Sequence, residues 1–329
     1  MRKPLLCLLV LLLPGAVLAA GSPHPVADAP IAVVASVKGK VEVTSARGGA
    51  PVAAAFGRAL ERGDKVSVAK GGVATLFFGD GNVITLAEQS SITIGGRSGA
   101  THGATALPGE VFSNVSRFVT AGSRQTGLVS MADMRAETDA GAPLLLAPRN
   151  TSVLDETPVL RWRAVPGATR YRVHVGPSAG GDAWTRESTA SAGAEDSLAF
   201  PADAAGLKPG VEYLWEVEAL DAKGALRREG AMVSVLPADA RESVRDNLAR
   251  IDESAGGAKD PAARFLAGSY LSGMGLYEDA ARQFQALVKL APDSPEPHEA
   301  LGNLYLHVGL SDLAAAEFQR ALALQRKAH

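Results

Sequence analysis

Cysteine is nearly absent from this chain. Among its 329 residues only Cys7 is a cysteine, and it lies in an N-terminal segment with the layout of a secretory signal peptide. Arg2 and Lys3 precede an apolar run from residue 5 to residue 13, and small residues follow near residue 19. The run is too short to span a bilayer as an anchor. Cleavage after residues 1–20 would leave a chain without disulfides or thiol chemistry, in the periplasm or outside the cell.

A surplus of either charge is also missing. The 33 basic residues nearly balance the 35 acidic residues, so we do not expect the basic surface of a nucleic-acid-binding protein. Aromatic residues make up 5% of the chain, which argues against a large stacking surface for bases or sugars. After the signal peptide no apolar run reaches the length of about 18 residues that a transmembrane helix needs, so none is expected.

The sequence lacks the common catalytic and metal-binding motifs. It contains no H-E-x-x-H, no paired-cysteine motif, no G-x-S-x-G and no P-loop, and its six histidines are scattered. We therefore expect a protein that is not an enzyme and that has no cofactor or bound metal. The alternative is a glycan hydrolase, which would need two acidic residues facing each other in a cleft, an arrangement that a sequence does not reveal.

Residues 31–96 follow a Pro- and Ala-rich leader at 21–30 and carry the pattern of a small all-β domain. Short β-branched runs recur along this segment without helices between them. The segment Gly79-Asp80-Gly81-Asn82 separates two of the runs, and Asp-Gly in that place indicates a tight hairpin. Asp80 is accordingly expected to be a turn residue and not a metal ligand.

This region resembles the FecR-like domain. The resemblance rests on Gly39-Lys40-Val41, on LERGDKV at 60–66 and on GVATLFFGDGNVITL at 72–86, and it covers about residues 32–95. In the regulators of that family the domain is periplasmic and passes a signal to a cytoplasmic segment that controls a sigma factor. This chain shows neither that segment nor a transmembrane helix ahead of the domain. The resemblance therefore implies an envelope β-module of unidentified ligand.

A second β-rich stretch occupies 143–236, after a segment at 97–142 that we expect to be a linker or irregular. Within that linker, residues 111–119 fit a short helix or a strand equally well. Trp162 and the alternating YRVHV at 171–175 predict strands with a buried face. The segment LKPGVEY places Tyr213 where a tyrosine corner has its tyrosine. The stretch resembles a fibronectin type III sandwich, and the lack of cysteines excludes the antibody type.

The C-terminal part of the chain repeats itself at a spacing of 34 residues. The residues Gly268, Gly275, Ala280 and Phe284 recur as Gly302, Gly309, Ala314 and Phe318. Each unit predicts two helices joined by a Gly-centred turn, with small residues that let the helices approach and an aromatic ring between them. Before the repeats, Val244, Leu248 and Ile251 predict an amphipathic helix that caps them. Residues 237–329 should thus form a helical cap and two repeats.

These units resemble the tetratricopeptide repeat over about residues 261–326, although Ala267 replaces a usual Leu and Arg326 a usual Pro. The resemblance implies a concave groove lined by the first helix of each unit. The residues predicted to face it are Phe265, Ser269, Glu299, Asn303 and Leu306. In one class of these domains, basic residues and Asn bind the terminal carboxylate of a peptide. Asn303 fits that pattern, whereas Glu299 has the wrong charge.

The sequence therefore predicts a multi-domain α+β protein with an all-β FecR-like domain, a β-sandwich in the middle and C-terminal helical repeat hairpins. The leading hypothesis is an exported scaffold or adaptor whose helical groove holds a protein partner in the bacterial cell envelope. One alternative is a sensory component of envelope signalling that acts through a separate membrane protein. Another is binding of peptidoglycan or a polysaccharide by the FecR-like module, with a cell-wall polymer as the partner.

Overall fold

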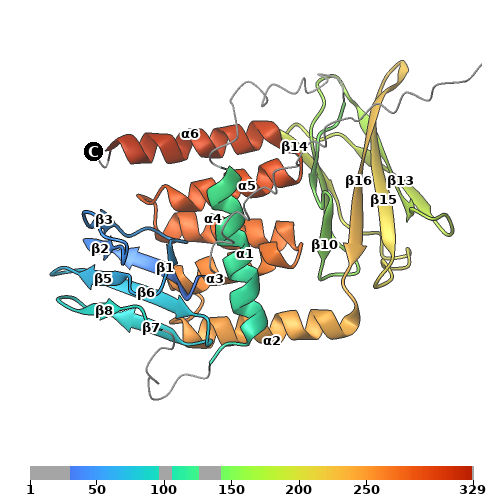
Figure 1. Ribbon diagram of the computed structural model, residues 1–329. Coiled ribbons are helices and arrows are strands. Elements are labelled where there is room, and N and C mark those ends of the chain that lie inside the picture. The colour runs from blue at the N-terminus through green and yellow to red at the C-terminus, as the bar shows by residue number, and fades with distance from the viewer. Residues whose placement is uncertain (1–29, 96–105, 126–141, 328–329) are drawn as a thin grey trace, which may run out of the picture.

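The computed structural model describes residues 30–95, 106–125 and 142–327. The predicted signal peptide and nearly all of the leader lie outside these ranges. Among the described helices, none is long and apolar enough to cross a membrane. Strands fill the N-terminal and middle parts and helices the C-terminal part, which confirms the predicted fold class (Figure 1).

The N-terminal domain consists of two four-stranded antiparallel sheets. Its strands are β1 (Ala32–Lys38), β2 (Val41–Thr44), β3 (Val52–Ala53), β4 (Ala59–Leu60), β5 (Lys65–Val68), β6 (Val73–Phe78), β7 (Val83–Leu86) and β8 (Ser91–Thr93). The sheets have the orders β4-β1-β6-β7 and β3-β2-β5-β8. The predicted hairpin joins β6 to β7. Gly81 in its turn has φ +87°, and a Cβ there would lie 2.1 Å from the carbonyl oxygen of Leu107, so only glycine fits.

Strand β1 is buried on both faces. Ala32 and Val34 belong to the core between the two sheets, whereas Val33 and Ala35 point into a second core on the other side, and all four are fully buried. Alternate side chains of a strand face opposite sides of its sheet, so a continuous apolar run marks a strand that is covered twice. The second cover comes from helices further along the chain.

Helix α1 (Gly109–Gln125) lies inside the segment that was expected to be a linker or irregular. The structure thus decides the question left open for residues 111–119, which are helical. Val111, Val115 and Val119 are spaced by four residues and form one buried stripe along the helix. The pattern fitted a strand as well because Val and Phe, which recur in this segment, are enriched in strands.

The middle domain is a β-sandwich of two sheets, as predicted. Its strands are β9 (Leu145–Ala147), β10 (Thr151–Val153), β11 (Leu160–Arg163), β12 (Arg170–Pro177), β13 (Trp184–Thr189), β14 (Glu195–Leu198), β15 (Glu212–Asp221) and β16 (Gly224–Val235). The sheets run β10-β16-β15-β12-β13 and β14-β11-β9. Trp162 and Trp215 are fully buried in the core. The hydroxyl of Tyr213 accepts the backbone N–H of Lys208 at 2.9 Å, as in a tyrosine corner.

Five helices complete the chain: α2 (Ala238–Ser254), α3 (Pro261–Gly273), α4 (Tyr277–Leu290), α5 (Glu296–His307) and α6 (Ser311–Lys327). Helix α3 pairs with α4 and α5 with α6. A Cβ on Gly268 would lie 2.8 Å from the ring of Phe284, and one on Gly302 would lie 2.6 Å from the ring of Phe318. The 34-residue repeat therefore exists because each glycine makes room for its aromatic partner.

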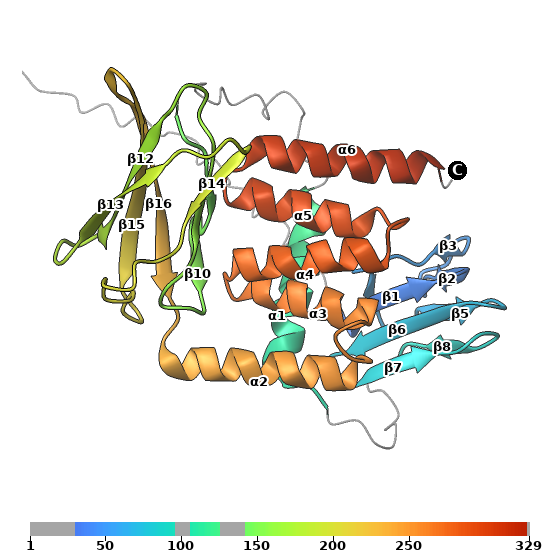
Figure 2. The same ribbon diagram turned by 180° about the vertical axis from the view of Figure 1, so that it is seen from behind.

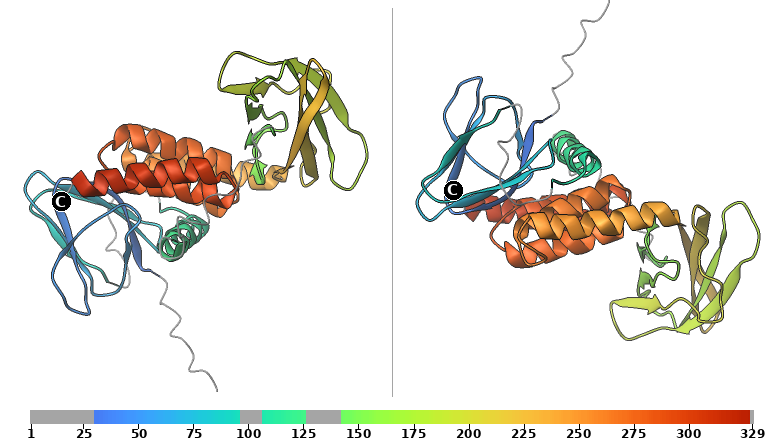
Figure 3. Two further views of the ribbon diagram at one scale, coloured as in Figure 1. Left: turned by 90° about the horizontal axis from the view of Figure 1, so that it is seen from above. Right: turned by 90° about the horizontal axis from the view of Figure 1, so that it is seen from below.

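The N-terminal domain and the sandwich both pack against the C-terminal helices. Figures 1 and 2 show helices α2 to α6 lying side by side, with the N-terminal domain at one end, the sandwich at the other and α1 crossing the helices. Views from above and below show the same arrangement (Figure 3). One core contains residues of β1, β6, α1 and the repeat helices. The N-terminal domain, α1 and the repeats thus stabilise one another.

Candidate partner-binding site

Two of the predicted groove residues lie in the shared core. Phe265 is 4% exposed, and its ring centroid lies 6.0 Å from that of Phe56 in the N-terminal domain. Ser269 is fully buried, and its hydroxyl has no hydrogen-bond partner in the described structure. The prediction that these residues face an open groove is wrong, because α1 and β1 pack against α3. The repeat pattern identified the right face of the helix but not what covers it.

Helix α1 fills the part of the groove that belongs to the first repeat unit. The ring of Phe118 stacks on that of Phe284, with centroids 5.3 Å apart and planes inclined by 23°. Gly273, at the end of α3, allows α1 to approach closely, since a Cβ there would lie 2.7 Å from Asn114. The first unit consequently has no free concave surface along these contacts.

A polar network, buried at Asn247 and Tyr270, links α1 to α2 and α3. The amide of Asn247 in α2 donates hydrogen bonds to the carboxylate of Glu110 in α1 and, at 3.0 Å, to the hydroxyl of Tyr270 in α3. Burial raises the pKa of Tyr270, so its hydroxyl stays protonated. Because buried polar groups are stable only with partners, this network specifies one orientation of the three helices.

A cavity of about 300 Å³ lies beside the second unit, bounded by α1, α3, α5 and the first residue of α4. Its polar and aromatic lining residues are Arg117, Phe118, Ser272, Tyr277, Asn303 and His307. The residues that line it include no Asp or Glu. This cavity is our candidate site.

Asn303 is the distinctive residue of the cavity. Its Oδ1 atom is buried and has no hydrogen-bond partner in the described structure. Leaving such an acceptor unpaired costs about 1–3 kcal/mol, which a ligand N–H would offset once the amide of Asn303 turns toward the cavity. On the rim, Arg117 donates to Oδ1 of Asn114 at 3.2 Å and to the carbonyl of Gly273 at 3.3 Å. The site can therefore bind a hydrogen-bond donor beside a fixed positive charge.

The aromatic side of the cavity comes from the two inter-helix turns. The ring of Tyr277 lies 4.5 Å from that of His307, centroid to centroid, with the planes inclined by 54°. Phe118 and Leu304 supply apolar surface beside them. The wall thus offers planar and apolar contacts next to the polar group of Asn303.

The remaining predicted groove residues do not line this cavity. Glu299 accepts a hydrogen bond from Gln325 in α6 at 2.7 Å, and burial raises the pKa of its carboxyl. Leu306 is half-buried. Of the five predicted residues only Asn303 lines the cavity, where it meets Arg117, Tyr277 and His307. The apolar spacing within 111–119 was the one signal for α1, and it gave no reason to place Arg117 beside the repeats.

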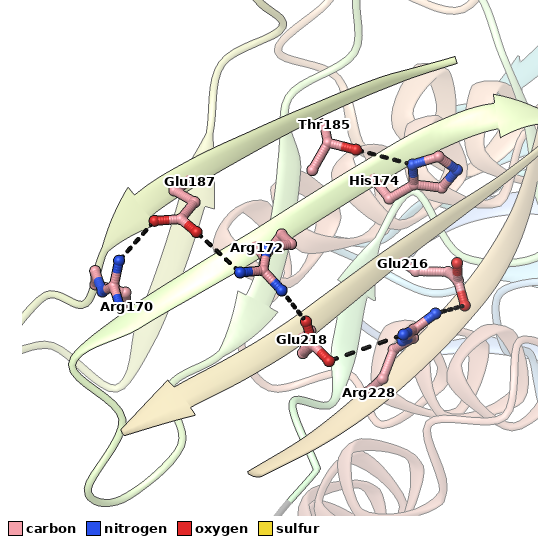
Figure 4. Close-up of polar contacts among 8 residues, drawn as sticks. All are labelled: Arg170, Arg172, His174, Thr185, Glu187, Glu216, Glu218 and Arg228. Carbon is pink, nitrogen blue, oxygen red and sulfur yellow. Dashed lines mark hydrogen bonds and ion pairs between the residues drawn. The ribbon is translucent and has the colours of Figure 1, made fainter. Parts of the chain in front are cut away.

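The outer face of the five-stranded sheet carries a ladder of charges (Figure 4). Arg172 on β12 donates to Glu187 on β13 at 3.1 Å and to Glu218 on β15 at 2.8 Å. Arg228 on β16 lies 3.6 Å from Glu216 and 3.8 Å from Glu218. Because these exposed charges neutralise one another, the face stabilises the strand register weakly and presents little net charge to a partner. No group of three or more metal-binding side chains occurs among the described residues.

Comparisons with known proteins give similarities to parts of the chain. No protein-family profile matches it, so the FecR-like resemblance remains a prediction, and no curated protein matches. A structure of MamA from Desulfovibrio magneticus RS-1 is 23% identical over 26% of this chain, with TM-score 0.24, and the chain spans about half of its length (49%).

Two further solved structures are similar to larger parts of the chain. A two-domain fibronectin type III segment of chicken tenascin is 12% identical, with TM-score 0.21, over 59% of this chain and 82% of that one. A tetra-tandem repeat from the extending region of a large adhesion protein is 14% identical, with TM-score 0.23, over 63% of this chain and 42% of that one. None of these partial similarities shows a family for the whole chain.

Proposed function

We propose that this chain is an exported, non-enzymatic scaffold that binds a peptide segment of a protein partner in the cavity between α1 and the second repeat unit. The observation that carries the proposal is Asn303, which lines the cavity and whose buried Oδ1 has no hydrogen-bond partner in the described structure. An extended peptide supplies backbone N–H groups, which are the donors that this acceptor lacks.

The size of the cavity limits what it holds. A volume of about 300 Å³ lies at the lower end of the range for ligand sites, about 300–1,000 Å³. It accommodates one or two side chains, with Phe118 and Leu304 as apolar contacts and Arg117 as a charged contact at the rim. The partner would therefore insert a short anchor and rest the remainder of its surface on the outside of the helices.

The cell envelope is the proposed setting because residues 1–20 have the layout of a signal peptide. Retention of the chain in the cytoplasm after expression in the source cell would contradict this part of the proposal. Fractionation with an antibody against the chain is the direct measurement.

Site-specific photo-crosslinking tests the binding site. A photoreactive amino acid replaces His307, which is exposed at the edge of the cavity, and a control chain carries it at Arg172 on the charged ladder. We expect a protein from the envelope fraction to crosslink at position 307 and not at 172, and Asn303→Leu to abolish the crosslink. The proposal fails if both positions capture the same protein or if Asn303→Leu leaves the crosslink unchanged.

A further inference from the structure

A second and larger cleft lies between the sandwich and the repeat helices. It has a volume of about 470 Å³ and is walled by β9 and β11 on one side and by α4 and α5 on the other. Ligand sites occur preferentially at the interfaces between domains. The cleft differs from the partner-binding cavity in most of its residues, although Tyr277 and Leu304 separate the two and line both.

Hydrogen bonds between the domains hold this cleft in shape. Arg149 donates from Nε to the carbonyl of Val308 at 2.9 Å and from Nη1 to Glu229 at 2.6 Å. The hydroxyl of Thr151 donates to the carbonyl of Gly275 at 2.9 Å and accepts the N–H of Tyr277 at 2.9 Å. Arg149, in the loop between β9 and β10, and Thr151, the first residue of β10, thus each contact the inter-helix turn of one repeat unit. The two walls are therefore fixed before any ligand arrives.

The floor of the cleft is apolar and accessible. Val159 is 50% exposed and lines the cleft together with Leu146, Leu304 and Val308. The ring of Tyr305 lies beside them, and its hydroxyl accepts a hydrogen bond from Gln285 at 3.1 Å. A half-exposed Val in a concave, polar-rimmed surface is available to an apolar side chain of a ligand.

Two guanidinium groups from different domains converge at the rim. Nη2 of Arg161 on β11 lies 3.5 Å from Oε1 of Glu278, and Nη1 of Arg282 on α4 lies 3.1 Å from the same oxygen. Arg282 also forms an ion pair with Asp279. Arg161, by contrast, makes the long contact with Glu278 and no other side-chain hydrogen bond among the described residues. A contact of 3.5 Å is at the limit of a hydrogen bond. Apart from this contact, no acceptor among the described residues pairs with the Arg161 guanidinium, so most of its N–H donors are available to an oxyanion.

We propose that this cleft binds an extended peptide segment in which an acidic residue stands next to an apolar one. The acidic side chain would receive two parallel hydrogen bonds from Arg161. Positive and negative groups would then alternate in the order ligand carboxylate, Arg161, Glu278 and Arg282. The apolar side chain would lie on Val159. Strand β9 is at the edge of its sheet, so an extended segment can align beside it and use its backbone groups.

This inference goes beyond the proposed function, because it assigns a second site with its own chemistry. Arg161 and Val159 do not line the cavity of Asn303. Asn303→Leu should therefore leave binding in the cleft unchanged, and failure of one proposal leaves the other standing.

Fluorescence anisotropy with designed peptides tests the cleft. The probe is a fluorescein-labelled heptapeptide that alternates Val and Glu, and the controls replace Glu by Gln or by Lys. We expect the Glu peptide to bind the full chain most tightly. Arg161→Gln and Val159→Glu should each weaken its binding about tenfold, the effect of losing one charge-assisted contact or the apolar contact. Arg172→Gln, on the charged ladder of the same domain, is the matched control and should have no effect.

Three results of this experiment would overturn the proposal. Equal affinity for the Glu and Gln peptides, or an equal loss of affinity in Arg161→Gln and Arg172→Gln, overturns the proposal, because binding would then be general and not centred on Arg161. The proposal is also overturned if no saturable binding is detected up to about 1 mM peptide. Melting temperatures of the variants, matched to that of the parent chain, confirm that the losses arise in the cleft and not from unfolding.

Discussion

The two repeat glycines allow a matched test of packing. Gly268 and Gly302 occupy corresponding positions in the interiors of α3 and α5, 34 residues apart. Replacing either by Ala gains about 1 kcal/mol of helix propensity. This gain is common to both variants. The difference between their free energies of unfolding therefore reports how well each aromatic ring can move away from the new methyl group.

The surroundings of the two rings differ. Phe284 is fully buried and is held by Phe118, at 5.3 Å, and by Phe265, at 6.4 Å between centroids. Phe318 is half-buried in the last helix pair. Overpacking a rigid core costs about 1–3 kcal/mol. We therefore expect Gly268→Ala to be less stable than Gly302→Ala by about 1–2 kcal/mol, because the ring of Phe284 has no room to shift.

Urea unfolding followed by far-UV circular dichroism measures this difference, since the helical signal reports α3 to α6. Equal free energies of unfolding for the two variants would refute the reasoning, as would a Gly268→Ala chain that is the more stable one. Either result would mean that the glycine spacing reflects something other than room for the aromatic rings.

Three further predictions concern the other parts of the molecule. Tyr213→Phe should lower the free energy of unfolding by about 1 kcal/mol, because the N–H of Lys208 loses its acceptor; denaturant unfolding measures it, and an unchanged stability would contradict a structural role for the corner. Arg149→Ala should uncouple the sandwich from the helices. All three tryptophans lie in the sandwich, so fluorescence and circular dichroism transitions that coincide in the parent chain should then separate, and coincidence in the variant would argue against the coupling. Burial raises the pKa of four carboxyl groups in the repeats: Glu278, Asp279, Glu296 and Glu299. The folded chain holds these protons more tightly than the unfolded chain, so their contribution to stability is present below their ordinary pKa range and is lost as the pH rises through the raised values. The melting temperature should accordingly rise as the pH falls from 7 toward that range, and Glu299→Gln should reduce the dependence.

The sequence predicted those features that depend on neighbours in the chain. The turn at Asp80-Gly81, the position of Tyr213 and the pairing of Gly268 with Phe284 all follow from local geometry or from a short repeat. Such features are readable because a given turn or helix hairpin admits few residue types.

The candidate site was predictable only in part. Asn303 was named from its place in the repeat, but Arg117 lies in α1, and no pattern indicates which surface a helix will cover. Phe265 was expected at an open groove, yet it contacts Phe56, more than two hundred positions earlier in the chain. Periodicity identifies an apolar face, whereas the partner of that face is set by contacts between distant segments.

The core shared by β1, α1 and α3 makes the sandwich an insertion within another folding unit. The first half of that unit leaves the ribosome long before the second half. Until the repeats arrive, Val33 and Val111 have no cover, and pairing across such a separation is slow. The chain should thus need protection while it is being made. A break between α1 and α3 would divide this shared core between two fragments, neither of which contains all of it.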